Sequence, residues 1–212
     1  MKALDLFCGA GGASMGIHRA GFEVTGVDIK PQPRYPFQFI QADAMEFPLE
    51  GYDFVWASPP CQRYTHAQHA AKNRDAHPDL VPETREKLIA WGGPWIMENV
   101  PGSPVFPHFI LCGSMFGLEL RRHRLFETSA PIFSLVPKCD HSRKIYSVFG
   151  HGSGNRNRSD WGTVADWKRA MGIDWMVRDE LSQAIPPAYS EFLCRQVMRV
   201  LTTSVDVAQA RE

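Results

Sequence analysis

Two side chains that can take part in covalent chemistry each lie at the end of a short apolar run. Cys61 follows two prolines that close the run 52–60, and Glu98 lies near the end of the run 94–100. A thiolate is a strong nucleophile, and a carboxyl group with apolar neighbours has a raised pKa and can act as a general acid. Because the prolines rigidify the backbone just before Cys61, the sequence predicts a reactive thiol at a strand exit rather than a cysteine packed in the core.

A glycine-rich turn, residues 5–12, joins the first apolar run to a helix-like segment. Glycines allow the backbone to approach a ligand closely and to adopt positive φ. The turn departs from the dinucleotide pattern G-x-G-x-x-G, because Ser14 stands where the third glycine is expected. Asp28 and Asp43 lie at the ends of the next two apolar runs and could accept hydrogen bonds from ribose hydroxyls and an adenine amino group. These positions favour an adenosine-containing ligand.

The elements that must position these residues alternate between strands and helices in the first half of the chain. Apolar runs predict strands at 2–7, 23–29, 37–43, 52–60 and 94–100, with helices at 13–21 and 82–93. Such alternation is typical of an α/β domain with a doubly wound, mostly parallel sheet. Ligands bind at the carboxyl ends of the strands in this class of fold, so Cys61, Glu98 and the glycine-rich turn are expected to meet at one edge.

The alternation weakens in the second half of the chain. The sequence predicts a short helix at 108–117, strands at 120–128 and 144–150, and helices at 163–172, 178–185 and 186–201. A polar, glycine-rich loop is predicted at 151–162 and a frayed tail at 202–212.

The composition is that of one globular domain. The chain has 212 residues, of which 44% are hydrophobic and 22% charged. It contains no apolar stretch of the roughly 18 residues that span a membrane, and its first residues lack a signal-peptide pattern. We therefore expect a single domain in the cytoplasm with no membrane partner, while the sequence leaves the oligomeric state open.

Five cysteines are scattered at positions 8, 61, 112, 139 and 194. Their odd number and the absence of a C-x-x-C spacing indicate reduced thiols rather than a disulfide framework. Cys139, His141 and His151 are conceivable metal ligands, but a C-x-H pair with one distant histidine and no clear fourth ligand is a poor zinc pattern. The sequence therefore predicts no metal.

The formal net charge is zero, so the whole chain carries no electrostatic signature of nucleic-acid binding. Between residues 143 and 169, however, six cations stand against only Asp160 and Asp166. The cations are Arg143, Lys144, Arg156, Arg158, Lys168 and Arg169. This segment is either a solvated basic face or a surface that contacts phosphates.

Five motifs occur in the order that they have in DNA (cytosine-5) methyltransferases. They are Asp5–Gly12, Pro60-Cys61-Gln62, Glu98-Asn99-Val100, Arg122-His123-Arg124 and Gln183-Ala184-Ile185-Pro186-Pro187. The chain resembles this family from residue 3 to about residue 200. The resemblance implies a Rossmann-like fold that uses S-adenosylmethionine to methylate C5 of cytosine in DNA.

The resemblance also implies a role for each catalytic residue. Cys61 would be the nucleophile that adds to C6 of the pyrimidine, and Glu98 would hold or protonate N3. Asn99 would support the turn that carries Cys61. Arg124 would bind the O2 edge of the base, and Arg122 would brace the active-site loop.

The cofactor site and the division of the chain follow from the same resemblance. The implied cofactor residues are Phe7, Gly9, Gly11, Asp28, Asp43, Pro60 and Gln183. Residues 1–126 would form the catalytic core, 127–165 a reduced target-recognition segment, 166–201 the helices that complete the core, and 202–212 the tail. The segment 63–85, directly after Cys61, would be a flap that closes over the base.

Three departures from the family pattern bear on the substrate. Leu120 stands where the family has glutamine before the arginine motif, and Ser182-Gln183 stand where it has Gly-Asn. The third departure is the brevity of 127–165, because reading several base pairs in a groove requires an inserted helix or ribbon. Short or lax sequence recognition through the loop around Arg156 and Arg158 is therefore expected.

Several functions are compatible with these motifs. The leading hypothesis is a DNA methyltransferase, similar to compact phage-encoded members, that flips its target cytosine out of the duplex. The same chemistry on RNA or on a free pyrimidine nucleotide is an alternative, as is a non-catalytic nucleic-acid-binding protein of the same fold. A dinucleotide-dependent oxidoreductase is disfavoured by Ser14 and by the lack of a hydride-transfer site.

Overall fold

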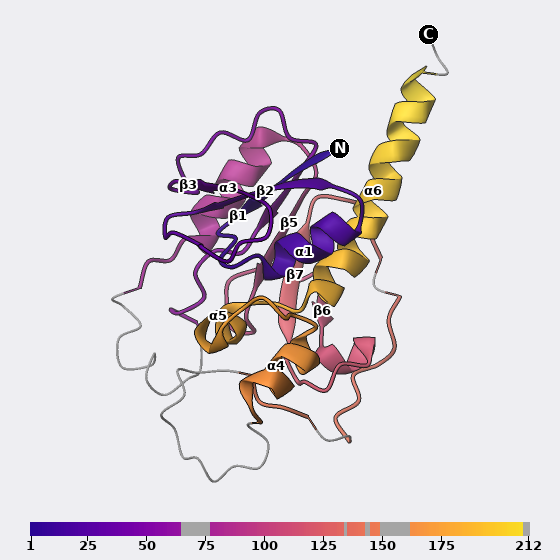
Figure 1. Cartoon of the computed structure of the whole chain (residues 1–212). Helices are drawn as coiled ribbons and strands as arrows, with labels where there is room; N and C mark the ends of the chain where they lie inside the picture. Colours follow the sequence, from indigo (N-terminus) through magenta and orange to yellow (C-terminus); the bar gives the residue numbers. More distant parts are fainter. Residues whose placement is uncertain (65–76, 134, 143–144, 149–161, 210–212) are drawn as a thin grey trace.

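A seven-stranded sheet forms the centre of the protein in a computed structural model that describes residues 1–64, 77–133, 135–142, 145–148 and 162–209 (Figure 1). The strand order is β3-β2-β1-β4-β5-β7-β6. The strands are β1 (Lys2–Leu6), β2 (Glu23–Asp28), β3 (Gln38–Gln41), β4 (Phe54–Ala57), β5 (Trp95–Asn99), β6 (Phe109–Leu111) and β7 (Arg124–Thr128). The first five strands pair in parallel, and β7 runs antiparallel to both β5 and β6. The predicted fold class, an α/β fold with a doubly wound, mostly parallel sheet, is confirmed.

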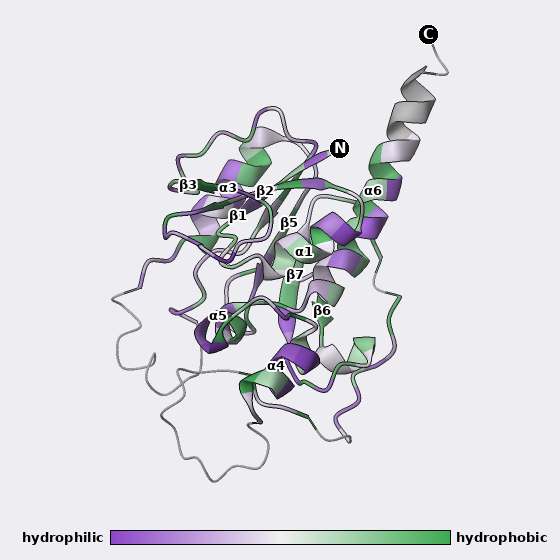
Figure 2. Ribbon diagram, in the orientation of Figure 1, coloured by the Kyte–Doolittle hydropathy of each residue, from purple (hydrophilic) through white to green (hydrophobic). Residues whose placement is uncertain are grey.

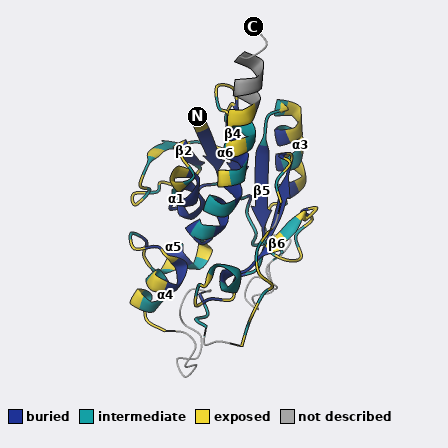
Figure 3. Cartoon of the chain, turned by 90° about the vertical axis from the view of Figure 1, so that its right-hand side faces the viewer, coloured by how far each residue is buried: buried dark blue, intermediate teal, exposed yellow. Residues whose placement is uncertain are grey.

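Helices cover both faces of the sheet because its strands are apolar on both sides. On one face, α1 (Gly12–Arg19) and α6 (Pro187–Gln209) pack over Ala3, Trp56 and Ile96. On the other face, α3 (Val81–Trp91) packs over a second cluster that includes Leu4 and Val55. Figure 2 shows the resulting alternation of hydrophobic and hydrophilic residues along α6. In Figure 3 the inner strand β5 is buried along its whole length.

Two short helices, α4 (Val164–Met171) and α5 (Arg178–Gln183), lie below the sheet in the view of Figure 1. They enclose a small separate core that contains Trp167, Met171 and Leu181 together with Leu120. A capping box between Thr163 and Asp166 begins α4. These helices lie beyond the carboxyl ends of the parallel strands and therefore border the edge where the candidate residues gather.

Three predicted elements are corrected by the structure. Residues 108–117 contain the strand β6 and a 3-10 helix, η2 (Gly113–Phe116), instead of one short helix, because Phe109–Leu111 complete the sheet beside β7. In the predicted strand 144–150, the described residues form only an isolated bridge between Tyr146 and Leu120. The predicted tail 202–212 continues α6 as far as Gln209, since the sequence there contains no glycine or proline that would end a helix.

No helix among the described residues combines the length and the apolar character that crossing a membrane requires.

Candidate active site

The glycine-rich turn leaves β1 in a conformation that few residue types adopt. Phe7, Gly9 and Gly11 have φ angles of 59°, 48° and 87°. The positive φ of Gly9 and Gly11 explains why glycines are needed there, whereas Phe7 is the one described non-glycine residue with positive φ. The amide of Gly9 donates a 3.0 Å hydrogen bond to Oδ2 of Asp28 at the end of β2. The turn and the predicted ribose-binding carboxylate thus lie in direct contact.

Asp5 lies under this turn and is fully buried. It accepts a short hydrogen bond from the Ser14 hydroxyl, and Tyr35 donates to the same hydroxyl oxygen at 2.8 Å. Burial raises the pKa of Asp5 to about 7, and the negative charges of Asp28 and Glu98 act in the same direction, while the Ser14 hydrogen bond opposes them. Ser14, which breaks the dinucleotide pattern in the sequence, therefore serves as the partner of a buried carboxyl group.

The turn that carries Cys61 is held by the neighbouring strand. Asn99, the last residue of β5, donates from Nδ2 to the carbonyl of Pro59 at 2.9 Å, and its Oδ1 accepts from the amide of Val100 at 2.9 Å. The carbonyl of Cys61 in turn accepts from the amide of Tyr64 at 3.0 Å. Parallel pairing of β4 and β5 brings these residues to the same edge, as the sequence predicts.

Glu98 is buried in the same region, with 6% of its surface exposed. Its Oε1 lies 2.9 Å from Nε of Arg124, the first residue of β7. Glu98 faces Phe126 across the antiparallel pair, and Arg124 lies two residues away on the same face, so the two side chains are diagonal neighbours. Ser58 also hydrogen-bonds to Glu98, while its Oγ accepts from Nε1 of Trp56 at 2.9 Å. Since the Ser58 oxygen is used as an acceptor, its hydroxyl hydrogen can be directed at the carboxylate.

Arg122 joins two segments that are far apart in the sequence. Its Nη1 donates to the carbonyl of Val148 at 2.5 Å and its Nη2 to the carbonyl of Ser182 at 2.6 Å. Tyr189 of α6 donates to the carbonyl of Arg122 at 2.7 Å. The guanidinium is buried and donates hydrogen bonds to two backbone carbonyls, so Arg122 links the segments that contain Val148 and Ser182.

The electrostatics of the site raise the pKa of both reactive groups. Burial raises the pKa of the Cys61 thiol, and the charge of Glu98 adds to this, whereas Arg124 and Arg122 oppose it. Burial also raises the pKa of Glu98, against the opposing effects of Arg124 and the Ser58 hydrogen bond. A buried carboxyl group that can keep its proton suits a general acid, and the two arginines supply the attraction that a thiolate needs.

The C-terminal motif returns to the glycine-rich turn, as predicted. A Cβ atom on Gly12 would lie 2.6 Å from the carbonyl oxygen of Ile185, so the two backbones are in close contact. Nε1 of Trp175 donates to the carbonyl of Ala10 at 2.8 Å. Gln183 itself ends α5 and is exposed.

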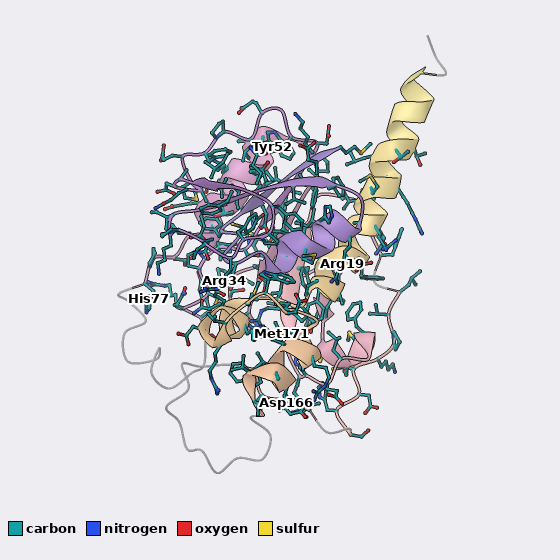
Figure 4. The ribbon with its side chains drawn as sticks, viewed as in Figure 1. Arg19, Arg34, Tyr52, His77, Asp166 and Met171 are labelled. Atoms are coloured by element: carbon teal, nitrogen blue, oxygen red, sulfur yellow. The ribbon has the colours of Figure 1, made fainter. Side chains whose placement is uncertain are left out.

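The loop after β2 is also tied to α5, through an ion pair. Nε of Arg34 lies 2.8 Å from Oε2 of Glu180. Figure 4 shows Arg34 beside α5. This ion pair joins the loop that contains Arg34 to α5, although the two are far apart in the sequence.

Other predicted residues make contacts of their own or lie outside the described residues. Asp43 is engaged in its own turn, where Oδ1 accepts from the amide of Met45 at 2.8 Å. Pro60 is partly buried beside Cys61. The basic loop at 149–161, with Arg156, Arg158 and the conceivable ligand His151, lies outside the described residues, as do Arg143, Lys144 and residues 65–76 of the predicted flap.

Sequence reasoning missed three polar side chains that support the site. They are Ser58 at Glu98, Tyr35 at Ser14 and Tyr189 at Arg122. Ser58 could have been found, because it directly precedes the two prolines. The two tyrosines could not, since each reaches its partner only through the packing of a distant loop or helix.

Two solved structures have a fold similar to that of this chain. A prophage-encoded protein of E. coli, assigned as a DNA modification methyltransferase, aligns with a TM-score of 0.61 and 14% identity over 95% of this chain and 99% of its own. The methyltransferase EhMeth of Entamoeba histolytica aligns with a TM-score of 0.57 and 13% identity over 97% and 98% of the two chains. At these identities the likeness shows the fold alone.

The family is indicated by the sequence of the N-terminal half. Residues 1–103 match the family model of C-5 cytosine-specific DNA methylases. This range includes the glycine-rich turn, Cys61 and Glu98, so the resemblance of this part of the chain to DNA (cytosine-5) methyltransferases is confirmed. No curated protein matches the chain.

Proposed function

We propose that the protein transfers a methyl group from S-adenosylmethionine to C5 of cytosine in DNA, through a covalent bond between Cys61 and C6. The observation that carries this proposal is the convergence of Cys61, the buried Glu98 and Arg124 at one edge of the sheet. A nucleophile, a proton donor and a cation for a carbonyl oxygen are the three groups that addition to a pyrimidine requires.

The residues at the ends of β1 and β2 fit the adenosine part of this cofactor. Gly9 and Gly11 hold a backbone conformation that leaves no side chain over the turn, and Asp28 offers carboxylate oxygens beside it. Asp43 and Gln183 would complete the site, Phe7 and Pro60 would line it, and Ile185 would cover it from the C-terminal motif. When bound, S-adenosylmethionine supplies an electrophilic methyl group on its sulfonium.

The side chains of the chain itself account for the changes at the base. The sulfur of Cys61 forms a bond to C6, and the electron pair of the C5–C6 double bond is displaced while Glu98 protonates N3. Arg124 binds the O2 edge, and Asn99 keeps the Cys61 turn in place through Pro59. C5 of the resulting enamine is nucleophilic and would take the methyl group, while the electron pair of the broken bond stays on the departing sulfur, which leaves as a neutral thioether. N3 would return its proton to Glu98, solvent would take the C5 proton, and the electron pair of the C5–H bond would re-form the C5–C6 double bond as the Cys61 thiolate leaves.

The choice of DNA rests on the family match and on the basic segment 143–169. The described part of this segment gives it little support, because Arg169 is paired with Asp166 at 2.8 Å and Lys168 donates to the carbonyl of Asp174. The cations on which the proposal relies are therefore those of the loop around Arg156 and Arg158, which lies outside the described residues.

A substrate panel tests the proposal. The purified protein and labelled S-adenosylmethionine are offered duplex DNA, RNA and dCMP in parallel, with Cys61→Ser as the control protein. We expect label in duplex DNA, and we expect Cys61→Ser to bind the cofactor but to transfer no methyl group. If only RNA or only dCMP is labelled, that molecule and not DNA is the substrate. Undiminished transfer by Cys61→Ser would overturn the mechanism.

A further inference from the structure

Two thiols and two imidazoles converge next to the arginine motif. The cluster consists of Cys112, His123, Cys139 and His141. One ligand atom from each residue lies within 4.8 Å of the other three. Within the part of the chain that the structure describes, no other group of three or more Cys, His, Asp or Glu side chains comes together in this way.

The separations match those of a four-coordinate metal site. With Zn–S bonds of about 2.3 Å and Zn–N bonds of about 2.05 Å, a tetrahedron places sulfur and nitrogen about 3.6 Å apart. Sγ of Cys112 lies 3.4 Å from Nε2 of His141, and Sγ of Cys139 lies 3.3 Å from Nε2 of His123. The pair Cys139–His141 is closer, at 2.5 Å, and would open by about 1 Å around an ion of these bond lengths.

A hydroxyl group orients both sulfur atoms from outside the cluster. Oγ of Ser114 lies 3.6 Å from Sγ of Cys112 and 3.5 Å from Sγ of Cys139. The same oxygen accepts from the amide of Asp140 at 3.1 Å, which ties it to the residue between Cys139 and His141. Outer contacts of this kind are typical of ligands held in place for a metal.

The segment that supplies Cys139 and His141 is irregular and is held at isolated points: Ile132 and Val136 pack against the main core, and the amide of Phe133 donates to Oε1 of Gln196 at 2.9 Å. From residue 129 to residue 142, its described residues form no helix or strand. Phe133 and Leu135 in this segment are 70% and 88% exposed. Cys112, by contrast, is fully buried at the end of β6, and His123 directly precedes β7. A metal ion would therefore attach an irregular segment to the edge of the sheet, as structural zinc does in small domains with a thin core.

The geometry points to one structural Zn²⁺ bound by Cys112, His123, Cys139 and His141. Two sulfur and two nitrogen ligands in a tetrahedral arrangement are typical of zinc, and four protein ligands leave no open position for catalysis. Binding would release the protons of the two thiols, so the two thiolates balance the charge of the ion.

The ion would also fix the peptide between the two arginines of the active site. His123 lies between Arg122 and Arg124, and its carbonyl accepts from Nη1 of Arg124 at 2.8 Å. Arg124 in turn pairs with Glu98. His123 is therefore a positioning residue. This site and its test do not depend on the proposed methyl transfer.

The inference departs from the prediction of no metal made from the sequence. The C-x-H pair was visible there, but the other two ligands were not. His123 stands 16 residues before Cys139, and Cys112 stands 29 residues before His141, each on a different strand edge. Only the antiparallel pairing of β6 with β7 brings them together.

Metal analysis of the whole protein tests the inference directly. The chain is purified without chelator, and its zinc content is measured by mass spectrometry. We expect about one zinc per chain, and we expect Co²⁺ exchanged into the site to show the absorption of a tetrahedral thiolate complex. A folded chain that holds less than 0.2 zinc per chain, and does not take up Co²⁺ after reduction and reloading, would overturn it.

Variants locate the ion and separate it from a disulfide. Cys139→Ser and His141→Gln should each lose at least about 90% of the zinc, whereas Cys194→Ala and His18→Gln, at a cysteine and a histidine outside the cluster, should keep it. Retention of zinc in both cluster variants would contradict the assignment. A mass 2 Da lower under non-reducing conditions, mapped to Cys112 and Cys139, would mean a disulfide in place of the ion. If a cluster variant fails to fold, the Co²⁺ spectrum of the unaltered chain still decides.

Discussion

At the scale of single residues, the site combines a thiol with a carboxyl group whose pKa is raised by burial. Glu98 is held by Arg124 at 2.9 Å and by Ser58, so its position is fixed before any base binds. Fixed donors cost no reorganisation during the reaction, which is why a small displacement of such a group lowers the rate strongly.

Replacing Glu98 by glutamine should therefore lower kcat for methyl transfer by at least about 100-fold, because the amide cannot protonate N3. Glu127→Gln is the matched control. Glu127 is also buried and paired with an arginine, Arg85, at 2.7 Å, but it lies outside the site. We expect this control to lower stability while kcat stays near the original value. If Glu98→Gln and the unaltered protein have equal kcat, Glu98 does not act as the proton donor.

Asp5 should make the stability of the protein depend on pH. The folded state holds its proton up to about pH 7, whereas the unfolded chain releases it near pH 3.8. Between these values the unfolded state binds fewer protons, so the free energy of unfolding falls as the pH rises, by roughly 1.4 kcal/mol per pH unit and on the order of 4 kcal/mol in all. Urea unfolding of the unaltered protein and of Asp5→Asn from pH 4.5 to 8 measures the difference. Parallel stability curves would contradict the burial of an ionisable Asp5.

Much of this site was predictable from residue types. Cys61, Glu98 and Asn99 lie where the apolar runs end, because parallel strands bring all their carboxyl ends to one edge. The zinc cluster was not predictable, since its ligands come from β6, β7 and an irregular segment whose pairing leaves no periodic signal in the sequence.

At the scale of elements, the contact between α1 and α6 holds the C-terminal motif against the glycine-rich turn. The two helices approach closely at Gly16, where a Cβ atom would lie 2.1 Å from Oγ of Ser190 and 2.2 Å from the carbonyl oxygen of Pro187. Oγ of Ser190 also donates to the carbonyl of Ala13 at 2.8 Å, so a buried hydrogen bond joins α6 to α1 where the two helices cross.

Gly16→Ala should therefore destabilise the protein by about 1–3 kcal/mol, although alanine favours a helix interior over glycine. The midpoint of urea unfolding measures this. Arg19→Ala, on the exposed side of the same helix, is the control and should change the stability by less than about 0.5 kcal/mol. Stabilisation by Gly16→Ala would mean that the two helices are not in contact as described.

The elements of the first half were predictable because each strand is a short apolar run that ends at glycine, proline or a polar residue. The predictions failed where the pattern is ambiguous. Phe109–Leu111 form an edge strand too short to be told from a helix by periodicity, and α6 passes residue 201 without a stop signal.

At the scale of the whole molecule, the proposed catalytic residues lie together at one edge of the sheet, while the segment proposed to select a target is short. Only 35 residues, 129–163, lie between β7, which begins at Arg124, and α4, which begins at Val164, and part of that range lies outside the described residues. The fold therefore supports the chemistry more directly than it supports the choice of substrate. A zinc ion in this range would give a short segment a fixed attachment without a large core.

The most direct test of the central claim is a covalent trap at Cys61. 5-Fluorocytosine is placed in the nucleic acid that the substrate panel labels, or supplied as the fluorinated nucleotide if only dCMP is labelled. Because fluorine at C5 cannot leave as a proton, the bond between Cys61 and C6 should persist after methyl transfer. Mass spectrometry should then find the adduct on the peptide that contains Cys61, only when cofactor is present, and never in Cys61→Ser. An adduct on another residue, or methyl transfer at the original rate by Cys61→Ser, would contradict the account.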